Sequence, residues 1–480
     1  MVALLQRFNR PVLAIVAVGV LAGGLRFNEL AFPQRRIFDE YYYPKSACIL
    51  LGYSDPVCDI NSANERFWRE DKLDTGAWVH PPLGKWTIAI GEVLFGAESS
   101  FGWRFSSALF GTATVVLLAV IAQLLFASAL WTFVVGLLLA LENLSFVQSR
   151  TATLDVFVAF WVVTGFLFLL LDRRWIDHRA DRPAPAPVTP RVRAPLWRPW
   201  RFAAGAALGA GMATKWSVVA AVGGAIALCL MWEVTRRRRA GLAHPVRDAI
   251  PAEGFGLVLA FLVTPALVYV GSYVGWFQHF GWNVAEWARL QGAMASYHEH
   301  LQKVDPATGE PVHAYLADAW KWLLLWRPLF YYGTYGEGFR RVIYANGNPA
   351  IFWGSLLAIP YVTFAWWRDR DWRAGFIVVA IASQYLPWFF ISRPQFFFYV
   401  MPIVPFLVLA DVYALRRLSE IRLESLGSAT TVRWVRSYAP LAVGFVLVAV
   451  GLFIWFWPSM TGGVMTDADW VRRAWFTTWT

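Results

Sequence analysis

The chain has 480 residues, of which 58% are hydrophobic, 17% aromatic and only 16% charged. Soluble domains carry about 25% charged residues, so this composition excludes a soluble globular protein and indicates bilayer-spanning helices. The formal net charge of +11 comes from 43 Lys and Arg against 32 Asp and Glu, and in a membrane chain it reflects orientation rather than binding to nucleic acid.

Eleven apolar runs predict an all-α polytopic membrane protein with about 11 transmembrane helices. The first run follows Arg7 and Arg10 without a convincing cleavage site, so we expect an uncleaved anchor. The fifth run is short and rich in Gly and Ala. In chain order the runs cover residues 11–27, 104–126, 129–147, 152–171, 201–213, 216–233, 254–275, 349–366, 374–391, 396–414 and 439–457.

The basic residues predict which side of the membrane each connecting segment faces. With the N-terminus in the cytoplasm, the inner segments carry an excess of Lys and Arg, whereas the charges balance in the outer segments. We therefore expect a cytoplasmic N-terminus, an extracytoplasmic C-terminus and two large outer loops, 27–103 and 276–348. The inner segment 182–199 is basic and Pro-rich, and with the four Arg at 236–239 it is expected to lie against anionic lipid head groups.

The first outer loop contains a further apolar segment, 81–96, which is too short and too interrupted to span a bilayer. Because two prolines open it, the segment suits a helix start, and we expect an interfacial helix with Trp86 and Phe95 as anchors. The same loop holds Cys48 and Cys58. The sequence leaves open whether they form a disulfide, which would stiffen the loop.

Unusual ionisable residues gather at the predicted outer ends of the spans, and such residues in or near lipid are costly and usually functional. They come from six separate turns or loop ends: Asp39 and Glu40 after the first span, His80 and Lys85 beside the interfacial helix, Arg104 at the start of the second span, Arg150 and Asp155 between the third and fourth, Lys215 between the fifth and sixth, and Arg393 between the ninth and tenth.

This arrangement suits the transfer of a sugar from a lipid phosphate to a hydroxyl group. A carboxylate takes the proton of the acceptor, and cations stabilise the phosphate that leaves, so no general acid is needed. A direct displacement of this kind inverts the anomeric centre. We expect four cations to contact the donor phosphate and three further residues to support the site: Arg104, Lys215, Lys85 and Arg393, then His80, Arg150 and Asp155.

Several of these side chains also suit structural roles. Arg104 suits an interfacial anchor, Lys85 can snorkel from its helix, and Arg150 and Asp155 can pair across a helix start. His80 has no second His or Cys at ligand spacing, so we assign no metal site, although a divalent cation bridged by the substrate stays open. Two acids inside predicted spans, Glu233 and Asp411, precede Arg residues by three to six positions and are expected to form ion pairs at the inner boundary.

The same residues stand in segments that resemble the protein O-mannosyltransferases, integral-membrane glycosyltransferases of the C-type (GT-C) fold. The resemblance runs from about residue 20 to 475. The matching segments, in the family's order, are FDEYYY (38–43), HPPLGK (80–85), FGWRFSSALFG (101–111), SRTATLDVFVAFW (149–161), ATKWS (213–217), GNP (347–349) and SRPQFFFYVMPIVPF (392–406).

The resemblance implies that Asp39 is the catalytic base for an acceptor Ser or Thr, that Glu40 orients the site and that Arg104 lies near the lipid phosphate. It implies a polyprenyl-phosphate-mannose donor, an exported polypeptide acceptor, mannose in α linkage and a bacterial plasma membrane with the active site facing outside. Export machinery is a further expected partner, and nucleic acid is not.

The loop 276–348 has about 73 residues, too few for the large soluble domain that eukaryotic members insert there, so the chain resembles the bacterial, actinobacterial type. We divide the chain into a catalytic membrane module, this second outer loop and a C-terminal membrane module of about four helices: 1–275, 276–348 and 349–480. Two alternatives stay open, a GT-C enzyme that glycosylates a lipid, and a transporter or flippase of polyprenyl-linked sugars. A transporter would place its binding residues near the midplane, often within an internal repeat, and the sequence has neither signal.

Overall fold

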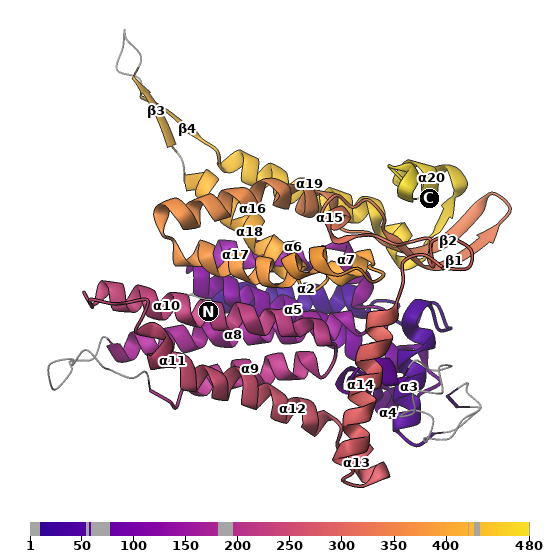
Figure 1. Ribbon diagram of the computed structural model, residues 1–480. Helices are drawn as coiled ribbons and strands as arrows, with labels where there is room; N and C mark the ends of the chain where they lie inside the picture. Colours follow the sequence, from indigo (N-terminus) through magenta and orange to yellow (C-terminus); the bar gives the residue numbers. More distant parts are fainter. Residues whose placement is uncertain are drawn as a thin grey trace, which may run out of the picture.

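The computed structural model describes residues 10–53, 57–58, 77–180, 195–420, 422–426 and 433–479. Long helices run side by side through the body of the molecule (Figure 1). In the described residues, eight helical segments are long and apolar enough to cross a membrane, and a ninth apolar helix, Ala129–Ala140, is shorter. The chain is therefore a mostly helical protein with the composition of a multi-pass membrane protein.

In the first half of the chain, the described residues with regular secondary structure are all helical. Its helices are α2 (Arg10–Phe27), η1 (Phe38–Tyr41), α3 (Tyr43–Leu50), η4 (Ala77–Val79), α4 (Leu83–Phe95), α5 (Ser100–Phe126), α6 (Ala129–Ala140), α7 (Asn143–Gln148), α8 (Asp155–Ala180), α9 (Pro199–Met212), η5 (Trp216–Val218), α10 (Val219–Arg239), α11 (Ala249–Val258), the π-helical turn η6 (Leu259–Val263) and α12 (Thr264–Ser272).

The second half adds short strands to the helices. Its elements are α13 (Val274–Phe280), α14 (Val284–His300), α15 (Ala319–Trp322), β1 (Leu329–Gly336), β2 (Phe339–Ala345), α16 (Pro349–Asp369), α17 (Trp372–Tyr385), η7 (Leu386–Phe390), η8 (Phe397–Val400), α18 (Val404–Glu420), β3 (Arg422–Leu426), β4 (Arg433–Ser437), α19 (Ala439–Thr461), β5 (Val464–Thr466), α20 (Asp467–Arg473) and η9 (Thr477–Trp479).

Each of the eleven predicted spans lies mostly on helix, but three are interrupted, among them the tenth, in which a turn at 401–403 separates η8 from α18. The third is broken into α6 and α7 because the Glu142 side chain caps α7, accepting from the backbone N–H groups of Leu144 and Ser145. The seventh contains η6 directly before Pro265. Proline lacks a backbone N–H and crowds the preceding turn, so a widened turn is expected there.

The expectation of an all-α chain is wrong in the second large loop. Strands β1 and β2 form an antiparallel hairpin, and β5 adds to β2 to complete a three-stranded sheet. Gly338 supplies the positive φ of +72° that the tight turn requires. A second hairpin, β3 with β4, follows α18.

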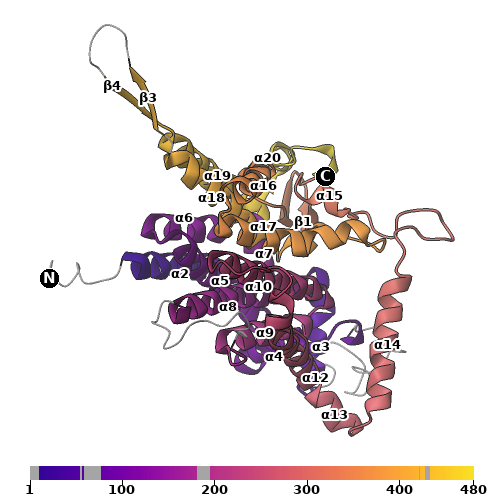
Figure 2. The same cartoon turned by 60° about the vertical axis from the view of Figure 1, so that its left-hand side comes forward.

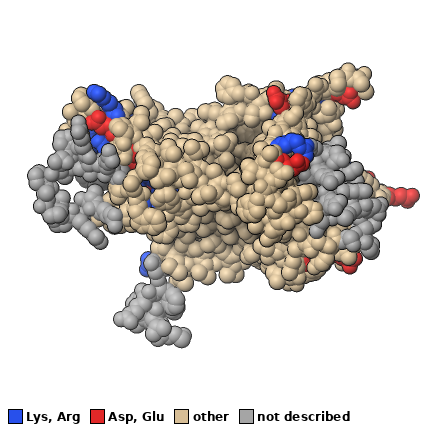
Figure 3. Space-filling model, turned by 60° about the horizontal axis from the view of Figure 1, so that its bottom comes forward, with Lys and Arg blue, Asp and Glu red and all other residues tan. Residues whose placement is uncertain are grey.

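The two ends of the helical body differ. One end carries α3, α4, α14 and the β1–β2 hairpin, and we call it the α14 end; the β3–β4 hairpin projects from the opposite end (Figures 1 and 2). Figure 3 shows charged side chains gathered toward the ends of one face, with a wide band between them that carries almost none. Such a band suits contact with lipid tails.

Helix α4 forms where the sequence predicts an interfacial helix, and its two sides differ in burial. It buries Gly84, Lys85 and Glu92, whereas apolar residues on its other side, among them Val93 and Leu94, are exposed. A short helix with one exposed apolar face suits the membrane interface.

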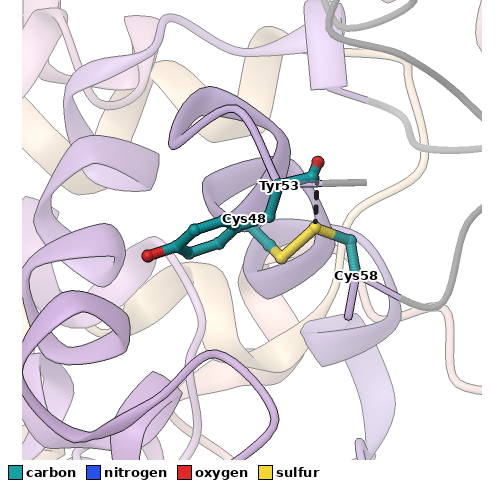
Figure 4. Close-up of a disulfide and its surroundings, with 3 residues drawn as sticks. All are labelled: Cys48, Tyr53 and Cys58. Carbon is teal, nitrogen blue, oxygen red and sulfur yellow. Dashed lines mark hydrogen bonds between the residues drawn. A yellow bond between two sulfur atoms is a disulfide. The ribbon is translucent and has the colours of Figure 1, made fainter. Parts of the chain in front are cut away.

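The structure contains a disulfide between Cys48 and Cys58, a bond that the sequence alone could not decide. Cys48 in α3 is bonded to Cys58, and both residues are fully buried. Figure 4 shows the bond beside Tyr53, whose carbonyl oxygen lies 3.4 Å from the Sγ atom of Cys58.

One of the two expected ion pairs at the opposite end is present. Glu233 accepts from Arg236 and Arg237. The pairing expected for Asp411 is wrong, because its carboxylate is buried and accepts from the Ser355 hydroxyl at 3.2 Å, while the following arginines pair with other carboxylates. Spacings of five and six residues do not bring side chains together on a helix, unlike the spacings of three and four at Glu233. Most of the segment 182–199 lies outside the described residues.

Candidate active site

Asp39 lies on η1, the single 3₁₀ turn between α2 and α3 at the α14 end. Its side chain is partly buried and forms no hydrogen bond or ion pair with any other described residue. Burial raises the pKa of Asp39 to about 7, Lys215 opposes the rise and Asp155 adds to it. Asp39 is therefore an unpartnered carboxylate that can accept a proton near neutral pH.

Glu40, the next residue, is fully buried and points the other way, into a closed network. Its two carboxylate oxygens accept from Nε and Nη2 of Arg104, both at 2.8 Å. They also accept from the backbone N–H groups of Ile37 at 3.0 Å and Ala152 at 2.9 Å. This bidentate pair joins the turn that carries Asp39 to α5 and to the segment before α8.

The remaining donors of Arg104 hold the chain that leads to Asp39. Nη1 donates to the carbonyls of Leu30 at 3.3 Å and Pro33 at 2.9 Å, and Nη2 donates to that of Arg35 at 3.0 Å. A guanidinium has five N–H donors, and all five are used here. All five N–H groups of Arg104 thus donate to the described chain, and the expected contact with the donor phosphate would require one of these hydrogen bonds to be replaced.

Asp155 and Lys215 form a second, nearly buried ion pair next to Asp39. Nζ of Lys215 donates to both carboxylate oxygens of Asp155 at 2.9 Å. The same Nζ lies 4.6 Å from the centre of the Tyr399 ring and 5.6 Å from that of Phe398. Asp155 begins α8, where the helix dipole favours a negative charge.

Arg393 and His80 meet at a third residue that the sequence reasoning missed, His298 of α14. Nη1 of Arg393 donates to Nδ1 of His298 at 2.8 Å, and the other ring nitrogen, Nε2, lies 2.8 Å from the Val79 carbonyl. The ring stacks on His80 at 5.2 Å. Since Nδ1 accepts from a guanidinium, Nε2 carries the proton and His298 is neutral. Burial and Arg393 accordingly lower its pKa to about 4.

The remaining two predicted residues act on the backbone instead. Lys85 is fully buried and its Nζ donates to the His80 carbonyl at 2.5 Å. The Arg150 guanidinium caps the C-terminal end of α2, donating to the carbonyls of Arg26 at 3.2 Å and Glu29 at 3.2 Å, among others. These contacts give the two cations structural partners.

Within the described part of the chain, these contacts bring Asp39, Asp155, Lys215, His80, His298 and Arg393 into one cluster. Arg393 lies 5.7 Å from the Tyr399 ring that Lys215 also faces. No sequence spacing points to His298, because it arrives on a helix of the second loop. Among the described residues, no group of three or more His, Cys, Asp or Glu could hold a metal ion.

A large apolar cavity opens next to this cluster. It has a volume of about 970 Å³ and lies between α10 and the segment from α11 to α12. Trp216, next to Lys215, lines its end at the active site, where its Nε1 donates to the Tyr269 hydroxyl at 2.9 Å. The Trp216 ring lies 6.1 Å from that of His298. The cavity therefore begins beside the cations and extends between two predicted spans.

Two family models match most of this chain. Residues 72–271 match the model described as dolichyl-phosphate-mannose-protein mannosyltransferase. Residues 283–479 match the model described as the C-terminal four TMM region of protein-O-mannosyltransferase.

Individual proteins extend the similarity over nearly the whole length. A polyprenol-phosphate-mannose–protein mannosyltransferase of Mycolicibacterium smegmatis (strain MKD8) is 31% identical over 503 residues, which cover 96% of this chain and 92% of the relative. One of Mycobacterium tuberculosis (strain CDC 1551 / Oshkosh) is 32% identical over 485 residues, which cover 92% and 86%. The solved S. cerevisiae protein O-mannosyltransferase Pmt1-Pmt2 complex bound to the sugar donor has the same fold, with a TM-score of 0.73 at 13% identity over 99% of this chain and 93% of that chain.

Proposed function

Because the chain belongs to the protein O-mannosyltransferase family, we propose that Asp39 is the base with which it transfers mannose from a polyprenyl-phosphate-mannose donor to Ser and Thr hydroxyls of exported polypeptides. The observation that carries this assignment is the free Asp39 carboxylate, which stands beside the Asp155–Lys215 pair while its neighbour Glu40 is fully bonded.

The reaction needs one proton transfer. The Asp39 carboxylate takes the proton of the acceptor hydroxyl as its oxygen attacks the anomeric carbon, and the bond from that carbon to the phosphate oxygen breaks. The phosphate leaves as an anion, so it takes no proton. The attacking oxygen enters opposite the leaving group, and the product has the inverted configuration.

Lys215 and Arg393 are our candidates for the donor phosphate. Among the described residues, the Lys215 ammonium group donates hydrogen bonds only to Asp155, and its Nζ lies 4.6 Å from the centre of the Tyr399 ring. Arg393 bonds His298 through a single Nη1 and keeps further donors. Arg104 and Lys85 have buried backbone or carboxylate partners, so we assign them support of the site.

The apolar cavity supports a donor with a long hydrocarbon chain. Its lining is almost entirely apolar, and it runs from Trp216, the neighbour of Lys215 in the chain, along two predicted spans. A polyprenyl chain placed there would bury its isoprene units while its phosphate stays near Lys215.

The disulfide supports an extracytoplasmic site. Disulfides persist in oxidising compartments and are rare in the cytosol, so a bond between Cys48 and Cys58 favours an outer location for the first loop. We therefore propose the topology of eleven spans with the N-terminus inside and the C-terminus outside, in a bacterial plasma membrane.

The deciding experiment is a transfer assay with the purified full chain, polyprenyl-phosphate-mannose and a Ser/Thr peptide, read by mass spectrometry. We expect a gain of one hexose, lost in Asp39→Asn and kept in Glu337→Gln, a matched change of an exposed acid in the β1–β2 turn. If Asp39→Asn transferred mannose at the wild-type rate, Asp39 would not be the catalytic base. Transfer to a lipid and not to the peptide would favour a glycolipid-forming enzyme.

A further inference from the structure

A second cavity, of about 310 Å³, lies at the α14 end, away from the cluster around Asp39. The end of α2, strand β2 and the end of α19 enclose it, and its walls include Glu29, Phe32, Arg341, Trp457 and Thr461. Its volume is at the lower end of the roughly 300–1,000 Å³ range of small-molecule sites. Neither the proposed transfer step nor the proposed donor uses it.

Two charged side chains line this cavity, and in the described residues Arg341 is half-buried whereas Glu29 is exposed. Nε of Arg341 is buried without a hydrogen-bond partner, and neither Arg341 nor Glu29 forms an ion pair through its side chain with the described part of the chain. Buried polar groups in proteins are nearly always paired. The buried Nε–H of Arg341 therefore points to a ligand that accepts from it, and the exposed Glu29 carboxylate in the same wall can accept from a hydroxyl group of that ligand.

The charges and rings restrict the chemistry of that ligand. A phosphate or carboxylate ligand would meet Glu29, and a cationic ligand would meet Arg341, so the two charges together favour a neutral molecule with many hydroxyl groups. Trp457 adds an aromatic ring to the wall. The Phe32 ring is fixed between the Arg341 guanidinium, 5.1 Å from its centre, and Gly462, where a Cβ atom would come within 2.3 Å of the ring.

The cavity is linked to the transfer centre through one short stretch of chain. Glu29 and Phe32 stand in the cavity wall. Arg104 holds the Leu30 carbonyl between them and the Pro33 carbonyl that follows Phe32 on the way to η1. Ten residues separate Glu29 from Asp39, so the two sites are at most about 36 Å apart. An extended acceptor segment of about ten residues can reach from one to the other.

We propose that this cavity is a second carbohydrate subsite, which binds a mannosyl group that the acceptor polypeptide already carries while the next Ser or Thr enters the transfer centre. The inference rests on the proposed function. It predicts an enzyme that prefers acceptors with one mannose in place.

The test compares two peptides that differ only in one α-mannosyl group, about ten residues from a free Thr. With the full-length wild-type protein, we expect a KM about three- to tenfold lower for the mannosylated peptide, the factor that one net hydrogen bond supplies. Arg341→Ala and Glu29→Gln should remove this preference and leave the KM and kcat for the unmodified peptide unchanged. Millimolar methyl α-mannoside should compete only with the mannosylated peptide.

Arg340→Ala is the matched control. Arg340 is adjacent on β2 with its side chain on the opposite face, where its Nε donates to Asp467 at 2.7 Å. This variant should keep the preference. Should Arg341→Ala fail to fold, Glu29→Gln still decides the matter, because only the backbone of Glu29 bonds Arg150.

Two results would overturn the subsite: equal KM values for both peptides in the wild type, or a preference that survives both variants. Failure of the proposed function looks different, because the wild type would then transfer no mannose to the unmodified peptide either.

Discussion

Glu40 and Arg104 form a buried bidentate pair, with both nitrogen–oxygen distances at 2.8 Å and neither side chain exposed. The pair stands one residue from the free carboxylate of Asp39. Two neighbouring acids are thus held for different purposes, one bonded on all sides and one open to a substrate.

Removing one member of this pair should destabilise the fold. Arg104→Met leaves the Glu40 carboxylate buried without its cation, and breaking a buried pair in this way costs about 3–5 kcal/mol. We expect a clear fall in Tm in detergent. The double variant Glu40→Gln/Arg104→Met should recover part of the loss, since it leaves no buried charge. Equal Tm values for Arg104→Met and the wild type would contradict the closed network.

Activity should depend on the protonation of Asp39. Its pKa of about 7 means that the base is available only above neutrality, so kcat should rise with pH through a midpoint near 7 and then level off. Because His298 is neutral at pH values above about 4, it should add no second inflection between pH 5.5 and 8. A pH–rate profile measured with saturating donor checks both points.

The raised pKa of Asp39 should also make the stability of the protein depend on pH, and stability should fall with rising pH whereas activity rises. The folded-state pKa of Asp39 is raised above its unfolded value of about 3.9, so its contribution to stability is fully present below that value and is lost as the pH rises through about 7. Asp39→Asn should therefore raise the Tm at pH 8 and leave it unchanged at pH 3.5. An equal change at both pH values would speak against the raised pKa.

Lys215 and Asp155 should move the midpoint of the pH profile in opposite directions. Lys215 lowers the pKa of Asp39 and Asp155 raises it. The profile of Lys215→Met should accordingly shift to higher pH, and that of Asp155→Asn to lower pH. Shifts in the same direction would mean that these variants act by disturbing the structure rather than through their charges.

The apolar cavity should discriminate between donors by chain length. Nothing lies within 4 Å of a Cβ atom built at Gly223, which lines the cavity, or at Gly254, which does not. Gly223→Phe should raise the KM of a long-chain donor at least tenfold, because losing the burial of two CH₂ groups already costs about 1.6 kcal/mol. A donor with one or two isoprene units should be unaffected, and Gly254→Phe should behave as the wild type with both.

The sequence predicted the helical membrane architecture and the positions where ionisable residues gather, because apolar runs and polar outliers are properties of the chain itself. It did not predict the β1–β2 hairpin, although Gly338 marks its turn. His298 could not be found, because its place beside Arg393 depends on how α14 crosses the end of the body. The division into three modules and the roles of the site residues stay predictions.

Spacing also could not separate cations that face a substrate from those that hold the backbone. Arg104 and Arg393 both stand next to predicted outer boundaries, yet one has all its donors used and the other does not. Only a count of hydrogen-bond partners tells them apart.

Arg150 and Arg104 both donate hydrogen bonds to backbone carbonyls of one stretch, from Leu25 to Arg35. The chain that leads to Asp39, the proposed base, is therefore held by two guanidinium groups from other segments, Arg104 in α5 and Arg150 in the turn between α7 and α8. We expect that a compound that separates this stretch from Arg104 or Arg150 would lower the activity without occupying a substrate site. Such a compound would be an allosteric inhibitor.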